Sequence, residues 1–171
     1  MSKVRKKNEI RRNLILRALL DEERLSLTDL KNNTGISLPV VTTIVAGLAE
    51  EGFVTEVNVK DENRGAGRPP SVFMINGNAG YILGIDIGRT KTDYVILDLA
   101  QNIILQERRE SVDLDSANIT VIDDLYKEVR GILKDANVDY KKVLGIGISI
   151  PGIVQGPKGI SKTYFDFSNE T

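Results

Sequence analysis

Apolar residues recur every three or four positions in three stretches of the first fifty residues, and this spacing predicts three helices. The first is expected over about residues 8–22, with a buried stripe made of Ile10, Leu14, Ile15, Ala18 and Leu19. The second begins after Ser26, because the sequence from Ser26 to Asp29 resembles a capping box, and it ends near Asn33. Gly35 then turns the chain into the third helix. Two short helices joined in this way are typical of a helix-turn-helix.

The third predicted helix has both of its ends marked in the sequence. Ser37 is a favourable N-cap, Pro39 is tolerated in the first turn, and Gly52 ends the helix. Its expected core face comprises Val41, Ile44, Val45 and Leu48. The residues on or near the other side, which we predict to contact DNA, are Ser37, Leu38, Pro39, Val40, Thr42 and Thr43. An ordinary amphipathic helix of a helical bundle is the alternative.

After Gly52 the apolar pattern changes to that of strands, expected over residues 53–60 and 71–76. The connecting sequence DENRGAGRPP predicts a hairpin with a glycine-rich, basic tip. Arg64 and Arg68 in this tip are suited to phosphates or to a narrow minor groove. With the helices before it, the hairpin predicts a winged helix-turn-helix. A surface loop that contains two arginines by chance is the alternative.

The second half of the chain predicts the element order βββαβ. Three strands are expected over residues 81–88, 89–99 and 102–112, with turns at Gly88 and at residues 100–102. A helix follows from about Ser116 or Asn118 to Ala136, and its expected apolar stripe comprises Ile119, Ile122, Leu125, Val129, Ile132 and Leu133. Residues 143–150 are almost wholly apolar, which predicts a strand covered on both faces. Pro151 and Gly152 then turn the chain out of the sheet.

Composition narrows the class of protein. The chain has 171 residues, of which 41% are hydrophobic, so a folded core is expected. Its longest apolar stretch, residues 143–154, is too short to span a membrane and contains glycine and proline. We expect no signal peptide and a cytoplasmic location. The absence of His and Cys excludes zinc sites built on imidazole or thiolate, and it excludes Ser–His and Cys–His catalytic dyads.

The charge is distributed unevenly. Residues 1–70 contain twelve Lys and Arg against ten Asp and Glu, a balance of +2, whereas residues 71–171 contain eleven against fourteen, a balance of −3. In the first seventeen residues Glu9 is the single acidic residue, and the basic ones are Lys3, Arg5, Lys6, Lys7, Arg11, Arg12 and Arg17. This pattern suits a segment beside DNA phosphates, although a solvated basic face is an equal alternative.

The hairpin sequence GIDIGRTKT, residues 84–92, carries the candidate chemistry of the second half. Asp86, Gly88 and Thr90 could direct a carboxylate, backbone N–H groups and a hydroxyl towards magnesium and phosphate. The alternative is a purely structural hairpin. Three segments in this order are similar to the ROK family, named for repressors, open reading frames and kinases: the helix-turn-helix with its GRPP wing, GIDIGRTKTDYVILDL, and VLGIGISIPGIV.

The resemblance implies an α+β fold. Residues 1–78 would form a winged helix-turn-helix domain with its wing and linker, and residues 79–171 the first, incomplete lobe of an actin-like (ribonuclease H-like) domain. It further implies a homo-oligomeric repressor of carbohydrate-utilisation genes that binds a double-stranded DNA operator and, in a full-length form, a sugar effector, without membrane contact. Without the second lobe, the lobe is expected to expose an apolar face.

One residue departs from the family pattern at the hairpin. Kinase members resemble DIGGTK there, whereas this chain has Arg89 at the second glycine, so ATP use is not expected. We therefore predict no enzymatic activity, no catalytic residue, no metal and no cofactor. The rival interpretations are a fragment of a sugar kinase and an interaction module that does not bind DNA.

Overall fold

The computed structural model describes residues 3–58, 71–111, 120–150, 153–155 and 160–162. The chain divides into two compact units, Met1–Ala79 with Leu99–Gln101 and Gly80–Asp98 with Asn102–Thr171. Each unit has its own cluster of buried apolar residues. Among the described residues, no helix is long and apolar enough to cross a membrane.

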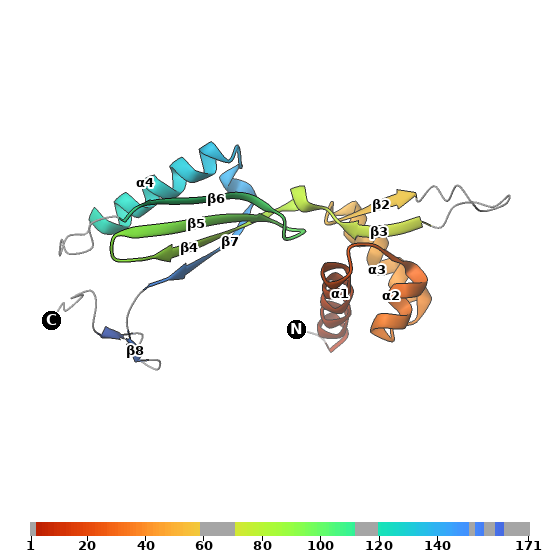
Figure 1. Ribbon diagram of the computed structural model, residues 1–171. Helices are drawn as coiled ribbons and strands as arrows, with labels where there is room; N and C mark the ends of the chain where they lie inside the picture. Colours follow the sequence, from red (N-terminus) through yellow and green to blue (C-terminus); the bar gives the residue numbers. More distant parts are fainter. Residues whose placement is uncertain (1–2, 59–70, 112–119, 151–152, 156–159, 163–171) are drawn as a thin grey trace. The chain divides into compact units, whose positions relative to one another are not determined.

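The first unit contains three helices and a small antiparallel sheet (Figure 1). Its elements are α1 (Lys3–Asp21), β1 (Leu25–Ser26), α2 (Leu27–Thr34), α3 (Leu38–Glu50), β2 (Val54–Asn58), β3 (Ser71–Ile75) and the 3-10 turn Gly77–Ala79. The strand order is β1-β3-β2, with Val54 opposite Ile75 and Leu25 opposite Phe73. This arrangement confirms the three helices and the hairpin predicted from the sequence. The two-residue strand β1 was not predicted.

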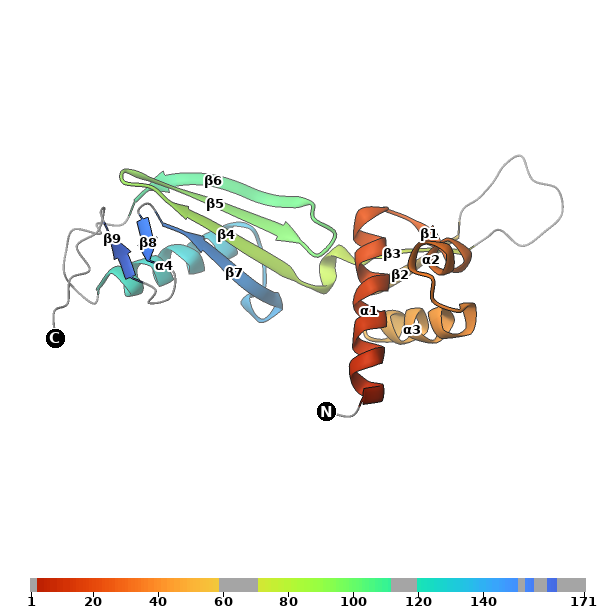
Figure 2. The same ribbon diagram turned by 90° about the horizontal axis from the view of Figure 1, so that it is seen from below.

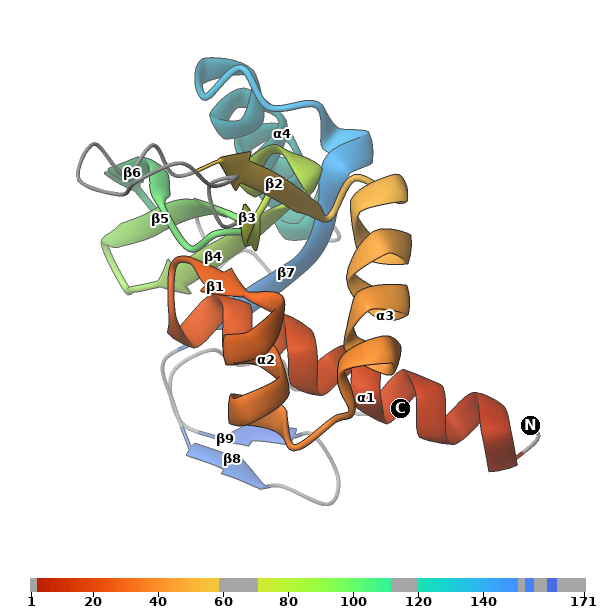
Figure 3. The same cartoon turned by 90° about the vertical axis from the view of Figure 1, so that its right-hand side faces the viewer.

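The core of the first unit lies where the three helices meet the sheet. Its buried side chains are Ile15, Leu19, Leu25, Leu30, Ile36, Val41, Val45, Leu48, Val54, Phe73 and Ile75. The predicted stripe of α1 is wrong at Ile10 and Leu14, which are 53% and 43% exposed. Figures 2 and 3 show that the N-terminal end of α1 runs past α3. Ile10 and Leu14 line an open groove between α1 and the turn before α3, so the core does not cover them. Ile44 of α3 is partly buried.

The second unit is a four-stranded sheet with one helix along one face (Figure 1). Its elements are β4 (Tyr81–Ile87), β5 (Lys91–Asp98), β6 (Ile103–Glu110), α4 (Thr120–Asp135), the 3-10 turn Tyr140–Lys142 and β7 (Val143–Ser149). The strand order is β6-β5-β4-β7, in which β7 runs parallel to β4 and the other pairs are antiparallel. The predicted βββαβ order is confirmed. A further hairpin of β8 (Ile153–Gln155) and β9 (Ile160–Lys162) was not predicted.

The core of the second unit lies between α4 and the middle of the sheet. It contains Leu83, Ile85 and Ile87 of β4, Tyr94 and Ile96 of β5, and Ile132, Leu133 and Val138. The predicted stripe of α4 is confirmed at Ile132 and Leu133 but wrong at Ile122, which is 75% exposed. Ile119 lies outside the described residues. Ile122 belongs to the first turn of α4, and the helix packs on the sheet from Leu125 onwards.

The prediction that residues 143–150 are covered on both faces is also wrong. Leu144, Ile146 and Ile148 are more than half exposed, and Ile150 is 40% exposed. The physical reason is position, because β7 is at the end of the sheet while α4 packs over β4 and β5. The expectation of an exposed apolar face on this unit is met by β7.

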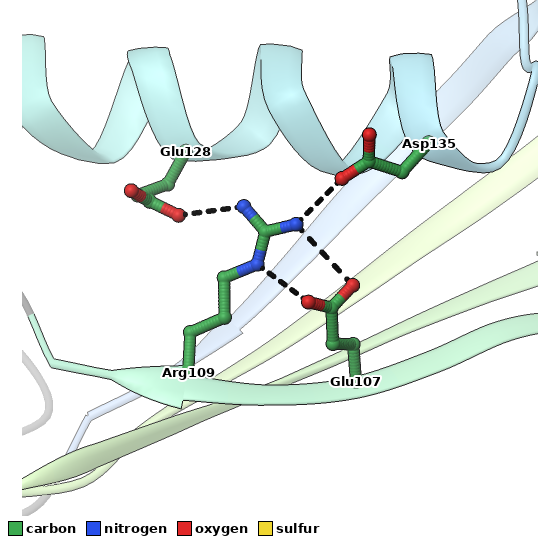
Figure 4. A network of polar contacts seen from close by, with 4 residues as sticks. All are labelled: Glu107, Arg109, Glu128 and Asp135. Carbon is green, nitrogen blue, oxygen red and sulfur yellow. Dashed lines mark hydrogen bonds and ion pairs between the residues drawn. The ribbon is translucent and has the colours of Figure 1, made fainter.

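A single arginine fastens α4 to β6 (Figure 4). Arg109 Nε donates to Glu107 Oε1 at 2.8 Å, Nη1 donates to Glu128 Oε2 at 3.0 Å, and Nη2 donates to Asp135 Oδ2 at 2.7 Å. Its hydrogen bonds to these carboxylates, with that to Glu107 first, raise the pKa of the Arg109 guanidinium. The network joins β6 to the middle and to the C-terminal end of α4.

Candidate nucleic-acid interface

The position of α3 is set by the helix and turn that precede it. Ser26 and Asp29 form a complete capping box at the start of α2, in which Asp29 N donates to Ser26 Oγ at 3.2 Å and Ser26 N donates to Asp29 Oδ2 at 2.9 Å. Hydrogen bonds donated to the carboxylate by Ser26 Oγ and Ser26 N, with the side-chain bond first, lower the pKa of Asp29. Gly35 ends α2 with φ of 68° and donates its N–H to Lys31 O at 2.9 Å. The sharp turn leads directly into α3.

The two sides of α3 differ as the sequence predicts. Val41, Val45 and Leu48 are buried in the core, while Ser37, Leu38, Pro39, Thr42 and Thr43 are exposed. Val40 is partly buried and packs against the core, so it offers less surface than the other predicted contact residues. Ala46 is exposed on the same helix and was missed, because an alanine carries no polar signal in a sequence. Apart from Leu38, the exposed side of α3 therefore consists of small side chains that permit a close approach.

The hydroxyl groups at this surface have different partners. Thr42 Oγ1 donates to Leu38 O at 2.9 Å, and Thr43 Oγ1 donates to Pro39 O at 2.9 Å. Ser37 occupies the N-cap position of α3, as predicted, but its side chain makes no cap hydrogen bond. The Ser37 hydroxyl proton is therefore available to a ligand, whereas the hydroxyl protons of Thr42 and Thr43 are already donated to backbone carbonyls.

A groove with basic walls lies beside the N-terminal end of α3. It is lined by Lys6, Lys7, Ile10, Arg11 and Leu14 of α1 and by Gly35, Ile36 and Ser37 of the turn. Lys6 and Lys7 are exposed, and Arg11 is partly exposed. The structure thus places part of the basic N-terminal run next to the predicted recognition helix.

Not every basic residue of α1 is available for DNA. Arg12 donates to both carboxylate oxygens of Glu51, at 2.6 and 2.5 Å, and its guanidinium lies 5.6 Å from the centre of the Phe53 ring. The hydrogen bonds from Arg12 lower the pKa of Glu51. Arg12 therefore joins α1 to the end of α3, and we assign it to the fold rather than to the interface.

The wing is defined at its base. Asn76 closes the hairpin by donating from its backbone N–H to Phe53 O at 2.9 Å and from Nδ2 to Gly52 O at 2.8 Å. Gly52 has φ of 81°, which suits the predicted end of α3. The predicted contact residues Arg64 and Arg68 lie outside the described residues, so their role stays a prediction.

In the second unit, the candidate hairpin holds together through its own hydrogen bonds. The N–H of Gly88 donates to Lys91 O at 2.9 Å, and a Cβ at position 88 would lie 2.5 Å from that oxygen. Ser111 Oγ donates to Gly88 O at 2.7 Å, and Ser111 N donates to Thr90 O at 3.0 Å. Glycine at position 88 is thus explained by the turn itself, whatever the hairpin binds.

Asp86 lies on the sheet face opposite α4, where it pairs in register with Asp93 of β5 and Ser149 of β7. A shallow groove on this face has a glycine floor, and its polar lining consists of Asp86, Asp93, Gln106 and Ser149. Asp93 accepts two hydrogen bonds from Arg108, at 2.6 and 2.7 Å, which lower its pKa. Asp86 is exposed on this face, whereas the backbone groups of the Gly88 and Thr90 turn bond within the hairpin and to Ser111.

Two family models match separate parts of the chain. Residues 82–165 match the model of the ROK family, and residues 14–57 match the model of the IclR helix-turn-helix domain.

Among curated proteins, the chain is 31% identical to a putative xylose repressor of Caldicellulosiruptor sp. (strain Rt8B.4) over 153 residues, which are 88% of this chain and 37% of that protein. It is 28% identical to the xylose repressor of Bacillus subtilis (strain 168), over 85% of this chain and 37% of that protein. It is 22% identical to the DNA-binding transcriptional repressor Mlc of Escherichia coli (strain K12), over 80% and 33%. The chain thus spans just over a third of the length of these relatives.

A solved structure confirms the predicted α+β fold. It is the crystal structure of a ROK family transcriptional regulator described as a homolog of the E. coli MLC protein. The likeness has a TM-score of 0.64 at 20% sequence identity and covers 90% of this chain and 38% of that one. At this identity the likeness shows the fold.

Proposed function

Because the chain combines a ROK family domain with an IclR-type helix-turn-helix domain, we propose that it is a sequence-specific DNA-binding repressor of carbohydrate-utilisation genes. The observation that carries this proposal is the surface formed by the exposed side of α3 and the adjoining basic groove of α1. The names of the relatives support it, since they are repressors and two are xylose repressors. Such a protein acts on DNA in the cytoplasm.

We assign separate roles to the two parts of the interface. Exposed residues of α3 enter the major groove, while Lys6, Lys7 and Arg11 contact the phosphates of the strand that passes the N-terminal end of that helix. Arg64 and Arg68 of the wing provide further contacts to the backbone or minor groove. In a longer form, the ROK domain would bind the sugar effector and assemble into an oligomer.

We propose no enzymatic role for the Asp86, Gly88 and Thr90 hairpin. Its glycine is needed for the turn, and the exposed Arg89 follows directly at the position where the family's kinases have a second glycine. The relatives with curated names are repressors, which favours a structural hairpin.

The test uses duplexes that the purified chain enriches from a randomised library, with affinity measured by fluorescence anisotropy over a range of salt concentrations. Replacing Lys6, Lys7 and Arg11 together by alanine removes three phosphate contacts. The slope of log affinity against log salt should fall by about 2 to 3, because each contact contributes about 0.9. Arg64→Ala/Arg68→Ala should also weaken binding, as judged by mobility shift.

Arg24→Ala is the matched control, since this exposed arginine lies beyond the C-terminal end of α1, between that helix and β1. Its slope should equal that of the unsubstituted chain. Failure of the unsubstituted chain to enrich any duplex would refute the proposed function. An unchanged slope in the triple variant would remove α1 from the interface and leave the function itself standing.

A further inference from the structure

The exposed side of α3 is poor in hydrogen-bond donors. Pro39, Thr42, Thr43 and Ala46 are exposed, whereas Val41 and Val45 on the opposite side are buried. Proline and alanine have no polar side-chain atom. The hydrogen-bonding character of this surface therefore depends on the two threonine hydroxyls.

Both threonine protons are already in use. Each hydroxyl donates to the carbonyl oxygen four residues before it, Thr42 to Leu38 and Thr43 to Pro39, at 2.9 Å in each case. A hydroxyl has one proton and two lone pairs, so its oxygen can still accept a hydrogen bond but has no proton left to donate. Both oxygens belong to exposed side chains and can meet a donor from outside.

We propose that Thr42 and Thr43 determine base specificity by accepting hydrogen bonds from the exocyclic amino group of adenine. This inference rests on the proposed function. In the major groove, adenine and cytosine present amino donors, whereas guanine presents the acceptors N7 and O6, which these threonines cannot serve. Adenine is favoured over cytosine because Leu38 exposes 41% of its surface nearby and can contact the methyl group of thymine on the paired strand.

Ser37 differs from the two threonines in a way that the proposal uses. Its hydroxyl makes no cap hydrogen bond, so it can donate to a phosphate oxygen at the N-terminal end of α3. Substitution of Ser37 should therefore weaken binding to all duplexes alike, while substitution of Thr42 or Thr43 should change which base is preferred.

The experiment starts from the duplexes enriched by the unsubstituted chain. At each adenine in turn, the base is replaced by purine, which lacks the amino group, or by 7-deazaadenine, which lacks N7. Loss of the amino group at one or two positions should weaken binding of the unsubstituted chain by about 3- to 10-fold, the range for a single hydrogen bond. Loss of N7 at the same positions should have no effect.

Thr42→Val and Thr43→Val remove the hydroxyls at nearly constant shape. The valine variant that lacks the accepting hydroxyl should bind the adenine duplex more weakly by the same factor. Replacing that adenine by purine should then weaken the variant no further. Thr28→Val, at an exposed threonine of α2, is the matched control and should retain the full purine effect. Melting curves followed by circular dichroism establish that each variant is folded.

Two results are distinguishable failures. If purine substitution weakens the valine variants as much as the unsubstituted chain, or if removal of N7 is the change that matters, the acceptor role is refuted while DNA binding stands. If the unsubstituted chain enriches no duplex, the proposed function itself fails and the inference falls with it.

Discussion

Ser26 and Asp29 show how two side chains at residue scale determine the path of the chain into the recognition helix. Besides the reciprocal backbone bonds of the capping box, Ser26 Oγ donates to Asp29 Oδ2 at 2.6 Å. The box satisfies N–H groups that the first turn of a helix leaves without partners. Since α2 and the Gly35 turn support α3, we expect the box to stabilise the whole first unit.

We predict that Ser26→Ala lowers the free energy of unfolding of the first unit by about 1 kcal/mol at neutral pH. Hydrogen bonds from Ser26 hold the pKa of Asp29 below its ordinary value. A carboxyl with a lowered folded-state pKa stabilises the fold above its unfolded-state pKa, and this contribution is lost as the pH falls through the folded-state value. The difference between Ser26→Ala and the unsubstituted chain should therefore shrink in acid.

The measurement is urea unfolding followed by far-ultraviolet circular dichroism at neutral and acidic pH. Thr28→Ala is the control, because Thr28 is exposed in the same turn and takes no part in the capping box. A cost that stays constant, or grows, as the pH falls would contradict the assignment to Asp29.

At the scale of elements, Arg109 is the principal polar link between α4 and the sheet. Its side chain is 25% exposed and meets three carboxylates, each about a third to a half exposed. Without the guanidinium, the three negative charges would repel one another across the helix and strand. Partial exposure to water reduces this cost below that of a fully buried pair.

We predict that Arg109→Gln destabilises the second unit by about 1 to 2 kcal/mol. Tyrosine fluorescence during urea unfolding reports on this unit, because Tyr81, Tyr94, Tyr126 and Tyr140 all belong to it and the first unit has no tyrosine. Arg108→Gln is the matched control. Arg108 is 67% exposed and pairs with Asp93, so its loss should cost less than the loss of Arg109. Equal effects of the two substitutions would show that the network adds nothing beyond a surface ion pair.

At the scale of the whole molecule, β7 is the strand whose apolar side chains are exposed at one end of the described sheet. Ile146 and Ile148 expose apolar surface on an end strand of the sheet, and an exposed apolar end strand is a template for pairing with another chain. The curated relatives are nearly three times as long as the part matched here.

We predict that the 171-residue chain self-associates through β7. Ile146→Lys/Ile148→Lys should shift the mass measured by light scattering after size-exclusion chromatography towards the monomer, because charge on an end strand opposes pairing. Ile104→Lys on β6, at the other end of the sheet, is the control, since Ile104 is 42% exposed. Association through β7 would be contradicted if only Ile104→Lys shifted the mass towards the monomer. It would also be contradicted if the masses of the unsubstituted chain and both variants did not change with protein concentration.

The sequence by itself determined the features that depend on neighbours along the chain. The capping box, the turn at Gly35, the start of α3 at Leu38, its end at Gly52 and the three strands of the meander were all predicted, because caps, positive φ and short apolar periods are local properties. Five of the six contact residues predicted on α3 are exposed for the same reason, while Val40 is partly buried and the exposed Ala46 was missed.

Only the tertiary structure decided which apolar faces are covered and which polar groups are already in use. An apolar stripe shows that a residue could be buried, but burial requires another element to reach it, and none in the described part of the chain reaches Ile10, Ile122 or the strand β7. In the same way, the sequence shows a hydroxyl at Thr42, while its geometry determines that the proton is donated to Leu38 O. Coverage and hydrogen-bond direction depend on the placement of atoms in space, which residue order along the chain does not specify.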